Sequence, residues 1–208
     1  MYRGSPAEDY VAARGLERAA ETFGLGYVGS ALLGHDRYTG YLAIPYLRPA
    51  GGEDGVATVR YRCIADACVK DDRGAYLSTQ GLKERHGSCK KYMTVPSDVP
   101  RLFNTAALIS PSPFLVVVEG EFDAMSWWLS GVPAVGAPGT TWAKYWGPVL
   151  GGYEAVYLIA EDGPGRIFMD SIAATAANAR VIRMKDDRDS NLVFQTHGAE
   201  ALRKRIGL

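Results

Sequence analysis

The sequence predicts an α/β protein in which a parallel four-stranded sheet, flanked by helices, follows a smaller basic α+β subdomain. From residue 114 onward, short apolar stretches alternate with helical stretches, which is typical of a parallel sheet covered on both faces. Before this point, two stretches alternate polar and apolar residues around a Gly-rich loop, as half-exposed strands do. We place the boundary between residues 1–110 and 111–208, because two prolines interrupt the chain near 105–113.

The first part contains helical and strand patterns in turn. Residues 7–23 are rich in helix formers with one Gly near the middle, and we expect two short helices or one broken helix there. Residues 40–47 and 56–64 alternate in the manner of strands, and residues 65–90 are polar and irregular.

The second part repeats strand and helix four times. The expected strands are 114–118, 132–138, 155–160 and 179–184, and the expected helices are 121–131, 140–150, 165–179 and 198–206. Right-handed crossovers between such strands place helices on both faces of the sheet.

Composition favours a soluble cytoplasmic protein. Hydrophobic residues make up 47% of the 208 residues and charged residues 22%. No apolar run reaches the roughly 18 residues that a membrane span needs, and the first fifteen residues lack the apolar core of a signal peptide. Three cysteines cannot all pair with one another, which favours a reducing compartment.

The charges are unevenly distributed although the net charge is zero. Residues 60–103 carry nine Lys/Arg against five acids, a difference of +4. Residues 114–170 carry two Lys/Arg against seven acids, a difference of −5. This pattern suits a protein that holds phosphate groups with one part and a divalent metal with another.

Acidic residues follow the first and third strands of the expected parallel sheet. Glu119 follows residues 114–118, and Glu161 and Asp162 follow residues 155–160. The carboxyl ends of parallel strands share one edge, where clustered carboxylates repel by about 4 kcal/mol at about 4 Å. Hard cations such as Mg²⁺ relieve this repulsion. Glu121 and Asp123 have a second interpretation, since acids in the first turn of a helix favour its dipole.

These acidic stretches resemble the Toprim domain, which bacterial-type primases, topoisomerases and certain nucleases share. The resembling stretches are VVVEGEFDA (116–124), VPAVGAPGTTW (132–142) and YLIAEDGPGRIF (157–168). The resemblance implies that Glu119 is the catalytic residue, and that Mg²⁺ or Mn²⁺ binds near it. The metal ligands that it implies are Glu119, Asp123 and Asp162, with Glu161 in support. One position departs from the family, because Ala160 stands where the first aspartate of its D-x-D motif is expected.

The preceding half resembles the catalytic core of bacterial-type (DnaG-like) DNA primases, most closely phage-encoded primases of actinobacterial hosts. The resembling stretches are 8–28, 39–47, 56–63 and 89–104 (CKKYMTVPSDVPRLFN), while residues 185–198 resemble a further segment of the Toprim family. The resemblance, together with the basic charge of residues 60–103, indicates a set of residues that bind nucleic acid or NTP. These are Arg60, Arg62, Lys90, Lys91, Tyr92, Arg101, Asn104, Asp189 and Asn191.

The resemblance implies DNA-dependent RNA primer synthesis on single-stranded DNA, in a bacterial host cytoplasm. The expected partners are the single-stranded template, NTPs and either a replicative helicase or a second primase subunit, with no membrane. Two alternatives remain: a Toprim metal-dependent nuclease or recombination factor, and a non-catalytic single-stranded-DNA-binding accessory protein. Metal-dependent DNA cleavage without NTP would distinguish the first alternative.

Three cysteines and one histidine lie within 27 residues: Cys63, Cys68, His86 and Cys89. Their spacing is compatible with structural Zn²⁺. Bacterial primases carry their zinc module in a separate N-terminal domain, so the sequence favours ordinary thiols and a surface histidine.

Overall fold

The chain divides into two compact units, each of which has its own sheet. The computed structural model describes residues 2–51, 55–87, 89–138, 142–161, 163–184 and 189–208. Contacts group Met1–Tyr46 with Gly52–Asp98, and Leu47–Gly51 with Val99–Leu208, so the predicted boundary after residue 110 falls within the second unit. Within the described residues, no helix combines the length and the apolar character that crossing a membrane requires.

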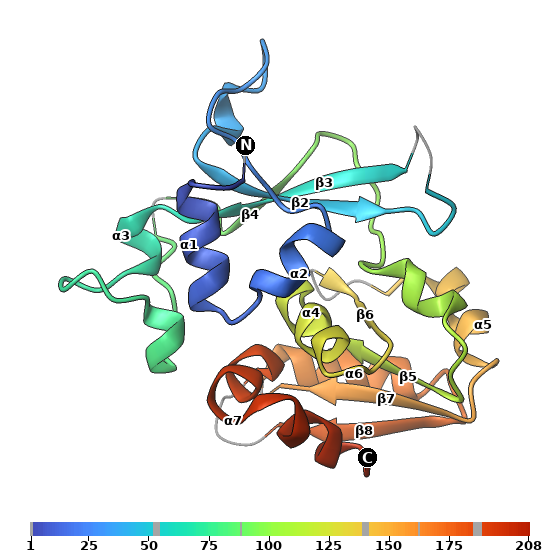
Figure 1. Cartoon of the computed structure of the whole chain (residues 1–208). Helices are drawn as coiled ribbons and strands as arrows, with labels where there is room; N and C mark the ends of the chain where they lie inside the picture. The colour runs from blue at the N-terminus through green and yellow to red at the C-terminus, as the bar shows by residue number, and fades with distance from the viewer. Residues whose placement is uncertain (1, 52–54, 88, 139–141, 162, 185–188) are drawn as a thin grey trace. The chain divides into compact units, whose positions relative to one another are not determined.

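The first unit combines an antiparallel sheet with short helices (Figure 1). Its strands lie in the order β1-β2-β3-β4, and both the β1–β2 and the β3–β4 pairs are antiparallel. The strands are β1 (Gly26–Tyr27), β2 (Tyr41–Leu47), β3 (Val56–Cys63) and β4 (Tyr92–Thr94). The helices are α1 (Pro6–Ala13), α2 (Glu17–Thr22), η1 (Asp36–Tyr38), α3 (Asp66–Val69) and η2 (Leu77–Gln80).

The two short helices expected within residues 7–23 are confirmed as α1 and α2. Gly15 has a φ of 67°, a conformation that favours glycine, and it separates them. The expectation of an irregular stretch over residues 65–90 was incomplete. The one-turn helices α3 and η2 form there because Cys68, Val69 and Leu77 are buried.

The second unit contains the predicted four-stranded sheet, in the order β6-β5-β7-β8. Every neighbouring pair is parallel, which confirms the predicted fold class. The strands are β5 (Phe114–Val118), β6 (Ala134–Gly136), β7 (Ala155–Ala160) and β8 (Ala179–Arg183). All but Phe114 of β5 is buried, as expected of a strand covered on both faces.

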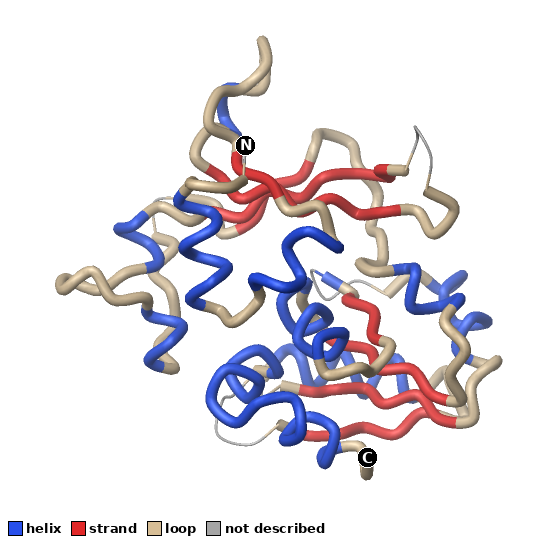
Figure 2. The backbone as a smooth tube through the Cα atoms, in the orientation of Figure 1, coloured by secondary structure: helices blue, strands red, loops and turns tan. Residues whose placement is uncertain are grey.

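Helices cover both faces of this sheet (Figures 1 and 2). They are η3 (Thr105–Ile109), α4 (Glu121–Leu129), η5 (Lys144–Trp146), α5 (Gly147–Leu150), α6 (Pro164–Ala173) and α7 (Ser190–Arg205). Helices α4 and α7 lie together on one face, and α6 lies on the other. Leu115 and Val117 share a buried cluster with Met169 and Ile172 of α6.

The last helix begins earlier than the sequence predicts. The prediction started it at Gly198, whereas α7 begins at Ser190 and changes direction at Gly198, where φ is 75°. Asp189 accounts for the early start, since its side chain accepts a hydrogen bond from the Leu192 N–H at 2.6 Å and caps the helix.

Candidate functional site

The site lies at the carboxyl ends of two neighbouring strands, β5 and β7. The helices that follow these strands, α4 and α6, lie on opposite faces of the sheet, so the ends of β5 and β7 form the topological switch point at which ligands bind in α/β proteins. Glu119 follows β5 and Glu161 follows β7. The backbone N–H of Glu161 donates a hydrogen bond to the Glu119 carboxylate. The structure therefore brings these two predicted residues together, whereas Asp162 lies outside the described residues.

The Glu119 carboxylate is packed closely against the first turn of α6. Burial raises the pKa of Glu119, and the hydrogen bond from Glu161 acts in the opposite direction. Among the described residues, no group donates a hydrogen bond to the buried Oε1 of Glu119. A Cβ added at Gly165 would overlap the carboxylate, so glycine is required for this approach. The positive end of the α6 dipole also lies at this carboxylate.

These residues fit a hard divalent cation. The unsatisfied Oε1 of Glu119 is a buried oxygen atom of the kind that ligates such cations. Glu161, whose backbone N–H bonds the Glu119 carboxylate, is half-buried and carries a second carboxyl group. Mg²⁺ and Mn²⁺ prefer such oxygen ligands. Ala160 is 2% exposed and belongs to the apolar cluster beneath α6. The residue that stands where the first D-x-D aspartate is expected therefore packs in the core.

Asp123 and Asn191 meet at the contact between α4 and α7. The Asn191 backbone N–H donates to Asp123 Oδ1 at 2.9 Å, and Asn191 Nδ2 donates to Ser126 Oγ at 3.1 Å. Trp127 Nε1 donates to Ser190 Oγ at 3.0 Å. These buried bonds hold the start of α7 on α4. Asp123, which the sequence suggests as a metal ligand, thus has a structural partner, and so does Asn191.

Glu121 is also buried in the first turn of α4, where it is 1% exposed. This position agrees with its interpretation as a helix-start residue.

The predicted basic residues of the first unit differ in their surroundings. Lys90 and Lys91 are exposed. Arg60 lies over the ring of Tyr92 with 4.2 Å between its Cζ and the ring centroid, and Arg62 lies 4.5 Å from the same centroid. Tyr92 therefore contacts two arginines as cation–π partners.

Arg62 makes an internal contact. It is 3% exposed and forms an ion pair with Glu84. A buried charge that loses its partner is strongly destabilised, so this ion pair stabilises the first unit, and nucleic-acid binding by Arg62 stays a prediction.

Two further predicted residues precede the parallel sheet. Asn104 adopts a left-handed conformation with φ of 58° and donates from Nδ2 to the Ala134 carbonyl at 2.8 Å. The adjacent Phe103 forms an antiparallel bridge with Gly136, and Asn104 therefore helps to dock this segment on β6.

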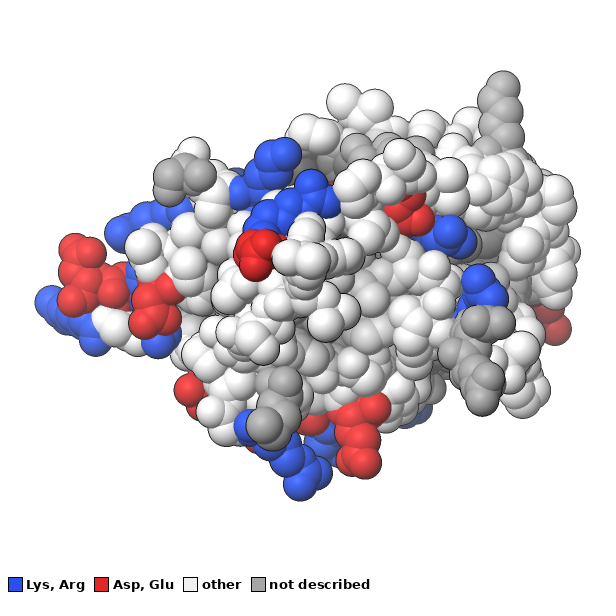
Figure 3. Space-filling model, turned by 90° about the horizontal axis from the view of Figure 1, so that it is seen from above, with Lys and Arg blue, Asp and Glu red and all other residues white. Residues whose placement is uncertain are grey.

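Arg101, another predicted basic residue, is half-buried. On the face seen in Figure 3, basic side chains gather in small groups among acidic ones on a largely uncharged surface.

Sequence reasoning missed Glu84, which accepts hydrogen bonds from four side chains. Tyr10 Oη donates at 2.7 Å and Arg14 at 2.5 Å, and Arg62 and His86 complete the set. Burial alone would raise the pKa of Glu84, but Arg62 and Arg14 hold it at about 2. Because these partners lie as far as 74 positions away, no local pattern indicates this network.

The fold gathers the predicted cysteines and histidine into one group, which we call the Cys/His cluster. Its members are Cys63, Cys68, His86 and Cys89. Their sulfur and nitrogen atoms all lie within 4.8 Å of one another. Among the residues that the structure describes, this is the one group of three or more His, Cys, Asp or Glu side chains arranged to hold a metal ion. Burial raises the pKa of each of the three thiols.

The fold is that of the RNA polymerase domain of bacterial primases. The Aquifex aeolicus primase structure, with zinc-binding and RNA polymerase domains, matches 98% of this chain and 56% of its own at a TM-score of 0.73 and 21% identity. The RNA polymerase domain of the Mycobacterium tuberculosis primase DnaG matches 97% of this chain and 75% of its own at a TM-score of 0.72 and 21% identity. No protein-family model matches the chain.

Among proteins compared by sequence, the Gene 57 protein of Mycobacterium phage D29 is 37% identical over 172 residues, which are 81% of this chain and 99% of that protein. The chain belongs to the family of this phage protein. It is also 25% identical to the DNA primase of Aquifex aeolicus, over 99% of this chain and 45% of the primase. The chain thus spans less than half of that relative.

Proposed function

We propose that the chain synthesises RNA primers on single-stranded DNA by metal-assisted nucleotidyl transfer. The observation that carries the proposal is the Glu119 carboxylate, which lies at the carboxyl ends of β5 and β7 with an unsatisfied buried oxygen. The likeness to primase RNA polymerase domains over almost the whole chain supports it. One of the neighbouring structures is the Mycobacterium tuberculosis domain in complex with a double-stranded DNA oligomer with a 6-nucleotide overhang.

In this proposal Glu119 and Glu161 hold a divalent cation, Mg²⁺ or Mn²⁺, with Asp162 as a further ligand. Such a cation stabilises negative charge on the attacking and leaving oxygens of phosphoryl transfer. Glu119 accepts the proton of the primer 3′-hydroxyl as general base. Lys90 and Lys91, both exposed, bind template phosphates through charge-assisted hydrogen bonds.

The same proposal places the protein in a bacterial host cytoplasm, where template and NTPs are available. A replicative helicase or a second primase subunit is the proposed protein partner, since the primase resemblance implies one.

Ribonucleotide incorporation on single-stranded DNA, with Mg²⁺ or Mn²⁺, tests the proposal. We expect the wild-type chain to make primers. Glu119→Gln should lower the rate of incorporation by at least about 100-fold, because the neutral amide cannot accept the proton and lacks the negative charge that attracts the cation. Glu154→Gln is the matched control, since Glu154 is exposed and precedes β7 at the opposite edge of the sheet.

Two results would favour another function. DNA cleavage by metal without NTP points to a nuclease. If the chain binds DNA but makes no primer with either Mg²⁺ or Mn²⁺, the result points to a non-catalytic accessory protein.

A further inference from the structure

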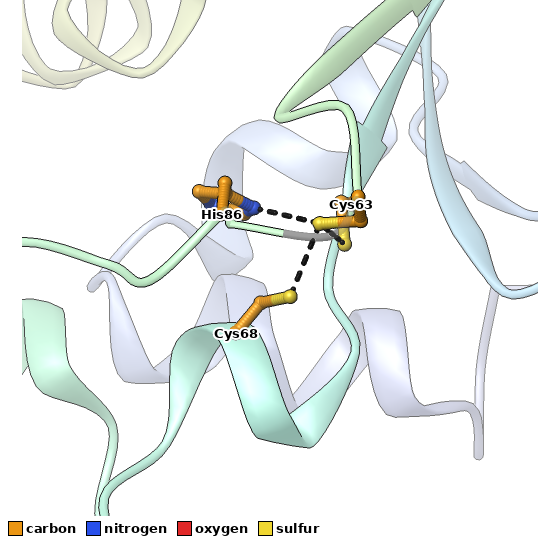
Figure 4. A group of neighbouring side chains, drawn as sticks. Cys63, Cys68 and His86 are labelled. Carbon is orange, nitrogen blue, oxygen red and sulfur yellow. Dashed lines mark hydrogen bonds between the residues drawn. The ribbon is translucent and has the colours of Figure 1, made fainter.

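Four metal-ligating side chains from three separate segments converge in the first unit. Cys63 ends β3, Cys68 lies on α3, and His86 and Cys89 precede β4. Figure 4 shows Cys63, Cys68 and His86 pointing toward a common centre. Cys89 Sγ lies 3.1 Å from the sulfurs of Cys63 and Cys68 and 3.2 Å from His86 Nδ1.

We propose that the Cys/His cluster is a structural zinc centre of the Cys₃His type. Zinc binds sulfur at about 2.3 Å and nitrogen at about 2.0–2.1 Å in a tetrahedron, so its ligand atoms lie about 3.5–3.8 Å apart. The four atoms of the cluster, all within 4.8 Å of one another, reach this arrangement with small side-chain adjustments. The four ligands complete the coordination sphere, and such closed sites are structural.

The orientation of His86 supports this assignment. Its Nε2 lies 2.8 Å from Glu84 Oε2 and donates to it, so Nδ1 is left to face the Cys89 sulfur. Zinc-bound histidines commonly donate their other N–H to a carboxylate, which fixes the ring and its tautomer. The side chains of His86 and Glu84 are only 8% and 5% exposed, and Arg14 and Arg62 hold Glu84 in place. Glu84 is therefore a positioning residue for the zinc ligand.

The position of the centre gives it a role in ordering the first unit. Residues 64–91 connect β3 to β4, and the cluster joins both ends of this connection to α3. The Cys63 N–H also donates to the Lys91 carbonyl at 3.1 Å. Zinc bound here fixes the segment that carries Lys90 and Lys91 relative to β3, which carries Arg60.

Metal analysis of the purified full chain tests the proposal independently of primer synthesis. We expect one zinc per chain, and we expect Co²⁺ in its place to give thiolate-to-cobalt charge-transfer absorption. His86→Cys keeps four ligands and retains one zinc, whereas His86→Ala binds zinc at least tenfold more weakly. His197→Ala, which removes an exposed histidine elsewhere, retains the wild-type zinc content.

Glu84→Gln tests the positioning role, and we expect 10- to 100-fold weaker zinc affinity at unchanged stoichiometry. Should this variant not fold, the comparison of His86→Cys with His86→Ala still decides the main point. The proposal is overturned if the chain neither contains zinc nor binds it on reconstitution, or if thiol reagents modify the three cysteines equally fast with and without added Zn²⁺. A disulfide between two of the cysteines in the protein as isolated under reducing conditions would also overturn it.

Discussion

Glu119 combines three properties that a catalytic carboxylate needs. It is half-buried, its pKa is raised by that burial, and one of its oxygens lacks a hydrogen-bond donor among the described residues. The backbone of Gly165 lies so close that any side chain there would occupy the space of the carboxylate. The orientation of Glu119 therefore depends on a glycine in the neighbouring helix.

Gly165→Ala should separate activity from stability. The added Cβ overlaps the flexible end of Glu119, so the carboxylate rotates away while the helix remains intact. Alanine also favours the helix by up to about 1 kcal/mol. We expect primer synthesis to fall by about 100-fold while the free energy of unfolding changes by less than about 1 kcal/mol. Chemical denaturation and the incorporation assay measure the two quantities.

Gly147→Ala is the control for this variant, because Gly147 also lies in a first helical turn and has nothing within 4 Å of an added Cβ. Equal activity losses in both variants would contradict the steric explanation.

At the scale of elements, the start of α7 is held on α4 by buried polar contacts. Asp123 accepts from the Asn191 backbone, and Asn191 in turn donates to Ser126. A buried acceptor of this kind satisfies an N–H that would otherwise be left without a partner at the helix start. The acidic residue next to the proposed active site thus stabilises the fold.

Asp123→Ala is expected to lower the free energy of unfolding by about 1–3 kcal/mol, because the Asn191 N–H loses its acceptor. Asp123→Asn should lose less, since the amide oxygen still accepts. Urea unfolding followed by circular dichroism, with and without Mg²⁺, measures both. Asp170→Ala, on the exposed side of α6, should stay within about 0.5 kcal/mol. A loss that appears only when Mg²⁺ is present would identify Asp123 as a metal ligand instead.

The sequence predicts elements well where burial alone determines them. Residues 155–160 form a strand with the predicted bounds, because a strand covered on both faces consists of apolar residues throughout. Short helices within residues 65–90 were missed, since the burial of Cys68 and Leu77 stabilises them rather than any local pattern. The start of α7 was missed because Gly198 has the conformation of a helix end yet lies inside the helix.

The same distinction applies to the candidate site. Strand ends place Glu119 beside Glu161, and the topology alone predicts that proximity. The Glu84 network and the internal role of Arg62 depend on the path of a long connection, which sequence patterns do not give.

At the scale of the whole molecule, charge is divided along the chain. Residues 60–103 carry an excess of four positive charges, and residues 114–170 an excess of five negative charges. One of these positive charges, Arg62, is buried in an ion pair with Glu84, and Lys70 pairs with Asp66 at 2.8 Å, so the sequence count overstates the charge that is available to nucleic acid. Lys90 and Lys91 are exposed and adjoin the Cys/His cluster, and we expect them to contribute most of the first unit's attraction for phosphate.

The salt dependence of DNA binding measures this contribution. Each phosphate neutralised on a single strand adds about 0.7 to the slope of log affinity against log salt. The double variant Lys90→Ala/Lys91→Ala should therefore bind single-stranded DNA more weakly and reduce the slope by about 1.4. Arg203→Ala/Lys204→Ala removes two exposed charges from the last helix and should leave the slope unchanged. Fluorescence anisotropy of a labelled oligonucleotide over a range of salt concentrations distinguishes the two variants, and equal slopes would place the phosphate contacts elsewhere on the chain.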